Sequence, residues 1–226
     1  NAADKLAPAD FDGDNKTDVA VFRPSNGTWY IFNSATSTAT ISQFGANGDL
    51  PIPNDFDGDG RADIAVFRPS DGGWYQLRSL GNQVFIQQFG SNGDIPQIFD
   101  YDGDGFGDLA VFRPSDGTWH FFKSSDSSYT AFPFGSSGDK PVAADYDGDG
   151  KTDVAVFRAT ADSNLPDFYI LTTGTFNYYG LSWGVPNDIP VVADYDGDGK
   201  ADIGIYRSSN NNWFLLRSTA GFTSTV

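Results

Sequence analysis

The fold of this chain is decided by one stretch, which reads DYDGDGKTDVAVFR from residue 145 to residue 158. Close copies begin at residues 10, 55, 100 and 194, so the five starts (10, 55, 100, 145, 194) are 45, 45, 45 and 49 residues apart. Other short motifs recur with the same spacing, among them Phe-Gly pairs at 44–45, 89–90 and 134–135 and Trp183-Gly184. A period of 40 to 50 residues is typical of β-propellers, in which each repeat forms one blade.

Four segments of each repeat have the composition of short strands bounded by turn residues. They are clearest at residues 141–145, 154–158, 118–122 and 129–134. The second and third segments carry apolar residues on both faces, so both faces must be covered. We therefore predict an all-β fold, a β-propeller of five four-stranded antiparallel blades, as a single domain over residues 1–226 with blades at about 1–45, 46–90, 91–135, 136–184 and 185–226. A β-solenoid or open array is the alternative, and we favour five blades that close on each other over a segment of a longer array.

The composition agrees with strands and excludes several function classes. All 30 acidic residues are Asp, Cys and Met are absent, and aromatic residues make up 15% of the chain. Without Glu, long amphipathic helices are not expected, and without Cys there are no disulfides or thiolate metal sites. The net charge of -16 argues against a nucleic-acid partner, because phosphate binding needs clustered Lys and Arg. No apolar run approaches the roughly 18 residues of a membrane span, so we expect no membrane insertion.

Aspartate occupies positions 1, 3, 5 and 9 of every copy, which accounts for 20 (4 × 5) of the 30 acidic residues. Carboxylates this close repel by roughly 3 to 4 kcal/mol per pair at an effective dielectric near 20. A hard divalent cation would neutralise them, and Ca²⁺, with 6 to 8 oxygen ligands in flexible geometry, suits the loop better than Mg²⁺. The backbone carbonyl at position 7 would add a ligand, and Gly at positions 4 and 6, with Asn15 as the one departure, would let the loop curl around the ion.

Two comparisons limit this interpretation. The loop is not an EF-hand, which needs Glu at position 12, where this chain has Val or Ile. Asp-Gly turns also serve as plain hairpin connectors, so metal-free turns are the alternative. Because five copies are in register, we favour about five Ca²⁺ ions, one per blade. The predicted ligands are Asp10, Asp12, Asp14, Lys16, Asp18, Asp55, Asp57, Asp59, Arg61, Asp63, Asp100, Asp102, Asp104, Phe106, Asp108, Asp145, Asp147, Asp149, Lys151, Asp153, Asp194, Asp196, Asp198, Lys200 and Asp202.

These loops, the Phe-Gly pairs and the run AVFRPSDGGW at 65–74 resemble the FG-GAP (VCBS-type) repeats of bacterial secreted proteins. Such repeats are related to the blades of integrin α-subunits and of some fungal propeller lectins. The resemblance covers the whole chain and implies a β-propeller with Ca²⁺ in the hairpin between the first two strands of each blade, in an extracellular or cell-surface setting. It does not imply one function, and five blades depart from the six or seven of the integrins and lectins.

Catalytic groups are scarce. His120, the only histidine, takes the place that Tyr30, Tyr75, Tyr169 and Phe214 take in the other repeats, so we interpret it as a structural aromatic. With no Cys and no second His, the residues needed for thiol catalysis or a His-ligated zinc site are absent, and a Ser-His-Asp triad is not expected. A glycosidase with two Asp residues stays open, but few acidic residues lie outside the repeated positions, namely Asp71, Asp116, Asp126, Asp162 and Asp167. We therefore expect no enzyme.

Two further repeated positions have structural interpretations. Trp29, Trp74, Trp119 and Trp213 would fill the core between blades, with sugar stacking as the alternative. The repeated arginine after the second strand would lie over an aromatic ring or pair with the repeated Asp before the first strand. An insertion at 161–166 in the fourth repeat breaks the symmetry. Extra loop length on a rigid scaffold is where binding specificity tends to lie, and drift in a solvent loop is an equal alternative.

These features favour a secreted, calcium-stabilised binding module. A lectin-like carbohydrate-binding module and a protein-interaction or adhesion module are about equally supported, with glycan or extracellular protein as partner. Near-identical blades favour a multivalent lectin, because equal sites multiply avidity. A structural domain of a larger cell-surface assembly is a third alternative.

Overall fold

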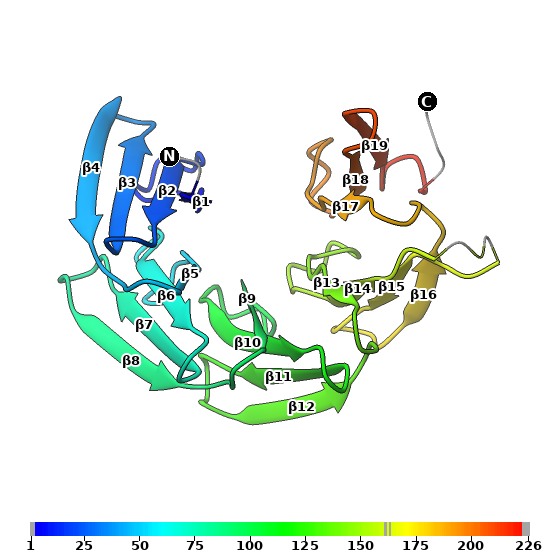
Figure 1. Cartoon of the computed structure of the whole chain (residues 1–226), viewed down its shortest axis with the longest axis horizontal. Helices are drawn as coiled ribbons and strands as arrows, with labels where there is room; N and C mark the ends of the chain where they lie inside the picture. The colour runs from blue at the N-terminus through cyan, green and yellow to red at the C-terminus, as the bar shows by residue number, and fades with distance from the viewer. Residues whose placement is uncertain (1–2, 161, 163, 223–226) are drawn as a thin grey trace. The chain divides into compact units, whose positions relative to one another are not determined.

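The computed structural model describes residues 3–160, 162 and 164–222. Within them every regular element is a β-strand, and the strands form five antiparallel sheets, in each of which spatial order follows chain order (Figure 1). The sheets are the five blades of a β-propeller, which confirms the predicted fold class. The strands are β1 (Lys5–Leu6), β2 (Val19–Arg23), β3 (Thr28–Asn33), β4 (Thr38–Gln43); β5 (Leu50–Pro51), β6 (Ile64–Arg68), β7 (Gly73–Leu77), β8 (Val84–Gln88); β9 (Ile95–Phe99), β10 (Asp108–Arg113), β11 (Thr118–Phe122), β12 (Tyr129–Pro133); β13 (Lys140–Pro141), β14 (Val154–Phe157), β15 (Phe168–Leu171), β16 (Tyr178–Leu181); and β17 (Ile189–Pro190), β18 (Ile203–Arg207), β19 (Asn212–Leu216).

The strands differ from the prediction at two places. The first strand of the fourth blade, expected at 141–145, is only the two residues of β13, followed by an isolated bridge between Ala144 and Asp153. The cause is local, since the chain must already turn into the Asp loop. The fifth sheet has three strands among the described residues. Its predicted fourth strand, by analogy with β4, falls at 222 and beyond, and residues 223–226 lie outside the described part.

The chain divides into two compact units. The first comprises Asn1–Phe99, Asp104–Val111 and His120–Thr130, and the second comprises Asp100–Gly103, Phe112–Trp119 and Ala131–Val226. The first unit therefore holds the whole of the first two blades, and the second unit holds the strands of the last two. The single domain over residues 1–226 stays a prediction.

The core of each unit lies between consecutive blades. In the first unit, Phe22 and Trp29 of the first blade pack with Val66 of the second, and Phe67 and Trp74 of the second pack with residues of the third, Leu109 and Val111. In the second unit, buried residues of β14 and β15 pack with Ile203 and Ile205 in the same way. The second strands of the second, third and fourth blades, β6, β10 and β14, are thus covered on both faces, as the sequence pattern predicted. The prediction is wrong for the first blade, where Val19 on β2 is 69% exposed and Phe32 on β3 is 49% exposed.

The tryptophans at the start of the third strand fill these cores in three blades. Trp29, Trp74 and Trp119 are fully buried, and each indole N–H donates to the carbonyl of the Phe in the following Phe-Gly pair, at 2.9, 2.6 and 2.9 Å. The core interpretation is confirmed for these three. It is wrong for Trp213, which is 57% exposed.

The repeated arginine makes both contacts that the sequence left open. In the second blade, Arg68 donates through Nε and Nη2 to the two carboxylate oxygens of Asp49, both at 2.9 Å, and its guanidinium lies 4.1 Å from the Tyr75 ring centroid. Charge-assisted bidentate pairs of this kind are strong and directional. In the first blade the Arg23 guanidinium lowers the pKa of Asp4 to about 2 by hydrogen bonding to its carboxylate. The same pair and ring contact recur at Arg158 and Arg207.

Candidate metal loops and binding groove

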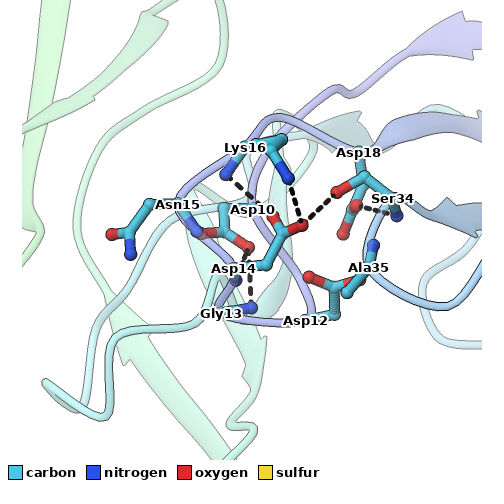
Figure 2. Close-up of polar contacts among 9 residues, drawn as sticks. All are labelled: Asp10, Asp12, Gly13, Asp14, Asn15, Lys16, Asp18, Ser34 and Ala35. Atoms are coloured by element: carbon cyan, nitrogen blue, oxygen red, sulfur yellow. Dashed lines mark hydrogen bonds and ion pairs between the residues drawn. The ribbon is translucent and has the colours of Figure 1, made fainter.

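The predicted metal loops connect the first and second strands of each blade, and we call them the Asp loops (residues 10–18, 55–63, 100–108, 145–153 and 194–202). The Asp at position 1 shapes the loop by accepting backbone hydrogen bonds. In the first loop, Asp10 accepts from the N–H groups of Gly13 and Asn15, both at 2.7 Å (Figure 2). Asn15 has φ of 62°, a left-handed conformation that Asn tolerates better than most residues, which explains why it can stand where other loops have Gly.

The structure brings positions 1, 3 and 9 of every loop together. Each of these Asp residues offers a carboxylate oxygen, and the three oxygens lie within 4.8 Å of one another. Their spacing is short enough for one ion to contact all three, so each blade carries one acidic cluster that could hold a metal. The clusters are Asp10, Asp12 and Asp18; Asp55, Asp57 and Asp63; Asp100, Asp102 and Asp108; Asp145, Asp147 and Asp153; and Asp194, Asp196 and Asp202.

The Asp at position 9 is buried in all five loops and anchors the loop to the turn after the third strand. Asp63 accepts hydrogen bonds from the N–H of Phe56 at 3.0 Å and of Ser79 at 2.6 Å. Burial nevertheless raises the pKa of Asp63, and in the fourth loop it raises the pKa of Asp153 to about 6, with repulsion from Asp147 adding to the effect. Burial raises the pKa of these two carboxyl groups because it penalises their charged form.

The Asp at position 5 lies outside these clusters. In the first loop, Asp14 accepts from the N–H of Lys16 and the hydroxyl of Ser34, both at 2.9 Å (Figure 2). Its equivalents Asp59, Asp104 and Asp198 make the same two contacts, and Asp149 accepts from the N–H of Lys151. Metal ligation by position 5 and by the position-7 carbonyls therefore stays a prediction.

The acidic clusters fit a hard divalent cation. One oxygen of the position-3 carboxylate, Oδ1 of Asp12, Asp57 and Asp196, is buried without a hydrogen-bond partner in the described part of the chain. A buried carboxylate oxygen without a partner is costly, and a cation would offset that cost. The donor set consists of oxygens alone, which suits Ca²⁺ or Mg²⁺ and excludes soft metals that prefer sulfur.

Consecutive Asp loops are joined by a hydrogen bond between their backbones. The N–H at position 8 of one loop donates to the carbonyl of position 1 of the preceding loop. Ala62 donates to Asp10 at 2.6 Å and Gly107 to Asp55 at 2.7 Å in the first unit, and Thr152 and Ala201 make the equivalent bonds in the second. The side chain at position 7 also lies over the Gly at position 4 of the preceding loop, as Arg61 does over Gly13.

A groove of about 620 Å³ lies within the first unit, between the second and third blades, and we call it the 2–3 groove. Its aromatic lining comes from Phe85 on β8, Phe106 in the third Asp loop and Phe122 on β11. Its polar lining includes Gln76, Gln87, Arg78, Lys123 and Ser124. Arg78 lies 4.3 Å from the Phe85 ring centroid and donates through Nε to Oε1 of Gln76 at 3.2 Å. The groove thus combines exposed ring faces with directional donors and acceptors.

Three groove residues depart from the repeat, and sequence reasoning missed them. Gln76 is 2% exposed where the other blades have Ile31, Phe121, Ile170 and Leu215. Phe106 stands at position 7, where the other loops have Lys or Arg, and Gly107 stands where they have Thr or Ala. Aligning the five repeats column by column shows all three departures, but only the fold shows that they meet at one groove.

Two other features of the sequence, His120 and the insertion in the fourth repeat, can be placed in the structure. The His120 ring stacks on Tyr129, with Nδ1 2.8 Å from the Tyr129 hydroxyl, as an aromatic in a packing role does. Of the insertion at 161–166, residues 161 and 163 lie outside the described part, and Leu165 is 46% exposed. After it, Asp167 is buried, and its carbonyl accepts from the N–H of Arg158 at 2.7 Å, so the insertion returns to the regular blade at once. Among the described residues there is no helix of the length and apolarity needed to cross a membrane.

Comparison with known families supports the repeat assignment. The family of FG-GAP-like repeats matches residues 55–111 and 100–156. The family match confirms the resemblance seen in the sequence over residues 55–156. A comparison with curated proteins gave no match.

Several solved structures share the fold. A lectin from Agrocybe aegerita, whose structure explains specific recognition of non-reducing terminal N-acetylglucosamine, is 17% identical with a TM-score of 0.68, over 99% of this chain and 65% of the lectin chain. TolB from Acinetobacter baumannii is 18% identical with a TM-score of 0.59, over 93% of this chain and 53% of its own. A Bacteroides caccae protein is 11% identical with a TM-score of 0.57, over 96% and 80%. At these identities the similarity extends to the fold alone, and this chain spans less than two thirds of the lectin and about half of TolB.

Proposed function

We propose that this chain is a secreted, calcium-stabilised, non-enzymatic binding module that takes a carbohydrate in the 2–3 groove. The observation that carries the proposal is the lining of that groove, in which aromatic faces alternate with amide, guanidinium and hydroxyl groups. Sugars present apolar C–H faces and hydroxyl edges, which pair with aromatic rings and with such donors and acceptors. A volume of about 620 Å³ is in the usual range for small-ligand sites.

The residues of the groove suit a neutral sugar in particular. Phe85 is 42% exposed and Phe106 is 38% exposed, so both rings can be reached from solvent. The cations Arg78 and Lys123 are matched by Asp57 and Asp104 in the same lining, so the groove has no excess of either charge. The similarity to the Agrocybe aegerita lectin adds support through the fold.

In this proposal the Asp loops keep the blades in place. Ca²⁺ would supply positive charge to each carboxylate cluster, and Asp10, Asp12, Asp18 and their equivalents would hold it. The ligand site is then one groove in which the repeat has changed, in contrast to the five equal pockets that the sequence favoured. The number of sugar-binding sites per chain distinguishes this monovalent module from a multivalent lectin with equal sites between blades.

A glycan array tests the proposal, run once with millimolar Ca²⁺ and once after chelation. We expect selective binding of neutral glycans, with N-acetylglucosamine-terminated ones as the first probe, and one site per chain by calorimetry. The variant Phe106→Lys, which restores the residue found in three other loops, should lose binding, and Lys151→Phe in the fourth loop is the matched control that keeps it. A blank array, or equal binding by Phe106→Lys, would contradict the proposal.

A protein-interaction module is the second candidate, favoured by apolar side chains on the fourth strands. Ile41 on β4 and Val84 and Ile86 on β8 are 67%, 58% and 56% exposed. Exposed apolar residues on strands at a sheet edge can pair with a strand of another protein. A blank glycan array together with loss of partner capture in an Ile86→Lys variant would favour this candidate.

A further inference from the structure

The 2–3 groove and the second Asp loop share residues, and this inference, which concerns control of the groove, rests on the proposed function. Asp57 and Leu80 both line the groove, and the Leu80 N–H donates to Oδ2 of Asp57 at 3.2 Å. The other oxygen, Oδ1 of Asp57, is the buried one without a hydrogen-bond partner in the acidic cluster. One carboxylate therefore belongs both to the candidate metal site and to a wall of the groove.

The wall from the third blade rests on the same loop. Phe106 lies so close over Gly58 that a Cβ at Gly58 would clash with its ring. The Gly107 N–H donates to the carbonyl of Asp55 at 2.7 Å, and a Cβ at Gly107 would clash with the Asn54 side chain. Gly58, whose φ is +78°, is thus required at this close approach, and the position of Phe106 depends on that of the second loop.

We propose that metal occupancy of the second Asp loop controls the 2–3 groove. Without a cation, Asp55, Asp57 and Asp63 repel one another, and the loop relaxes away from the position in which it holds Leu80, Phe106 and Gly107. With the cluster neutralised, the loop holds both walls in the arrangement that binds sugar. By reciprocity, sugar bound in the groove must raise the calcium affinity of this loop by the same factor.

The first Asp loop provides a matched control in the same unit. It has the same local bonds, since the Ala35 N–H donates to Oδ2 of Asp12 at 3.0 Å and the Ala62 N–H donates to the carbonyl of Asp10 at 2.6 Å. Neither Ala35 nor Ala62 lines the 2–3 groove. Asp55→Asn and Asp10→Asn therefore each weaken one metal site of the same design, and only Asp55 belongs to the cluster whose loop lines the groove.

The first experiment uses Ca²⁺ alone and needs no sugar. Hydrogen exchange is measured with and without millimolar Ca²⁺ on wild type, Asp55→Asn and Asp10→Asn. We expect Ca²⁺ to slow exchange at Leu80 and Gly107 by at least about fivefold, which is the lower end of typical coupling between two sites. This slowing should occur in wild type and Asp10→Asn but not in Asp55→Asn. In Asp10→Asn the lost protection should fall on Ala35 and Ala62. Equal protection of Leu80 and Gly107 in all three proteins would overturn the proposal.

The second experiment tests reciprocity by calorimetric Ca²⁺ titration with and without saturating N-acetylglucosamine. We expect the affinity of one site to rise at least about fivefold in wild type and to stay unchanged in Phe106→Lys, whose carboxylates are all intact. If Asp55→Asn does not fold, Phe106→Lys still tests the coupling. Sugar binding that is equal with Ca²⁺, after chelation and in Asp55→Asn would overturn the coupling and leave the proposed function standing. If wild type binds no sugar, the proposed function fails, and the exchange experiment decides the coupling alone.

Discussion

The junction of the first two blades and the junction of the second and third blades are built from the same repeat, yet they present different chemistry. Both keep the backbone bond between Asp loops, from Ala62 to Asp10 and from Gly107 to Asp55. At the first junction the buried side chain at the middle of the third strand is Ile31, and at the second it is Gln76. A repeat can thus keep the bonds that set the fold while a few side chains change what one junction can bind.

The largest expected effect concerns the Asp loops, which both junctions share. At 1 mM Ca²⁺ and a dissociation constant near 0.1 mM, each site stabilises the fold by about 1.4 kcal/mol, or about 7 kcal/mol for five additive sites. Chelation should then lower the melting temperature by about 15 to 25 °C. Differential scanning calorimetry with and without chelator measures this. A melting temperature that does not respond to chelation would remove the metal from both junctions.

The next effect concerns the buried tryptophans, which the two junctions also share. Trp29→Ala and Trp74→Ala should each lower the free energy of unfolding by about 3 to 5 kcal/mol, because each removes a fully buried ring. Trp213→Ala is the control, with an expected loss below about 1 kcal/mol at a 57% exposed position. Denaturant unfolding measures all three. A cost at Trp213 equal to that at Trp74 would mean that the exposed ring is covered in solution.

A smaller effect concerns the side chain that distinguishes the junctions. Gln76→Ile should raise the free energy of unfolding by about 1 kcal/mol, because it removes a buried polar group, and should weaken sugar binding by about tenfold. Ile31→Gln at the first junction is the converse and should lower stability by more than about 1 kcal/mol. If Gln76→Ile is less stable than wild type, Gln76 supports the fold and is not a residue kept for binding.

The smallest effect is on pH dependence and separates the loops from the rest of each blade. The folded-state pKa of Asp153, about 6, lies above its ordinary value of 3.8, so the metal-free folded state binds more protons than the unfolded state between these values. The stability of the chelated protein should therefore rise as pH falls from 6 toward 4, because protonation relieves the buried charge.

The same protonation should compete with Ca²⁺, so calcium affinity should fall from pH 7 to pH 5. Urea unfolding of the chelated protein between pH 6 and pH 4 measures the rise in stability. Calcium titration at pH 7 and pH 5 measures the fall in affinity. An Asp153→Asn variant should lose both pH dependences. If the variant keeps them, the group that is protonated is not Asp153.

The outcome of the sequence analysis differs between the Asp loops and the groove. The spacing of Asp10, Asp12 and Asp18 predicted one acidic cluster per blade, because all its members lie in one short loop whose shape its own glycines determine. The surroundings of position 5 depend on a more distant part of the chain, since Asp14 accepts a hydrogen bond from the hydroxyl of Ser34, 20 residues away in the turn after β3.

The sequence by itself determined the repeat, the all-β blades and the clustering of three carboxylates per loop. All of these follow from residues close together in the chain, and each is repeated five times. Only the tertiary structure decided where the repeat matters for binding. Gln76 and Phe106 are 30 residues apart in different blades (106 − 76), and they meet because stacked sheets bring the third strand of one blade beside the loop of the next. The 2–3 groove thus arises from packing between blades, which no single repeat encodes.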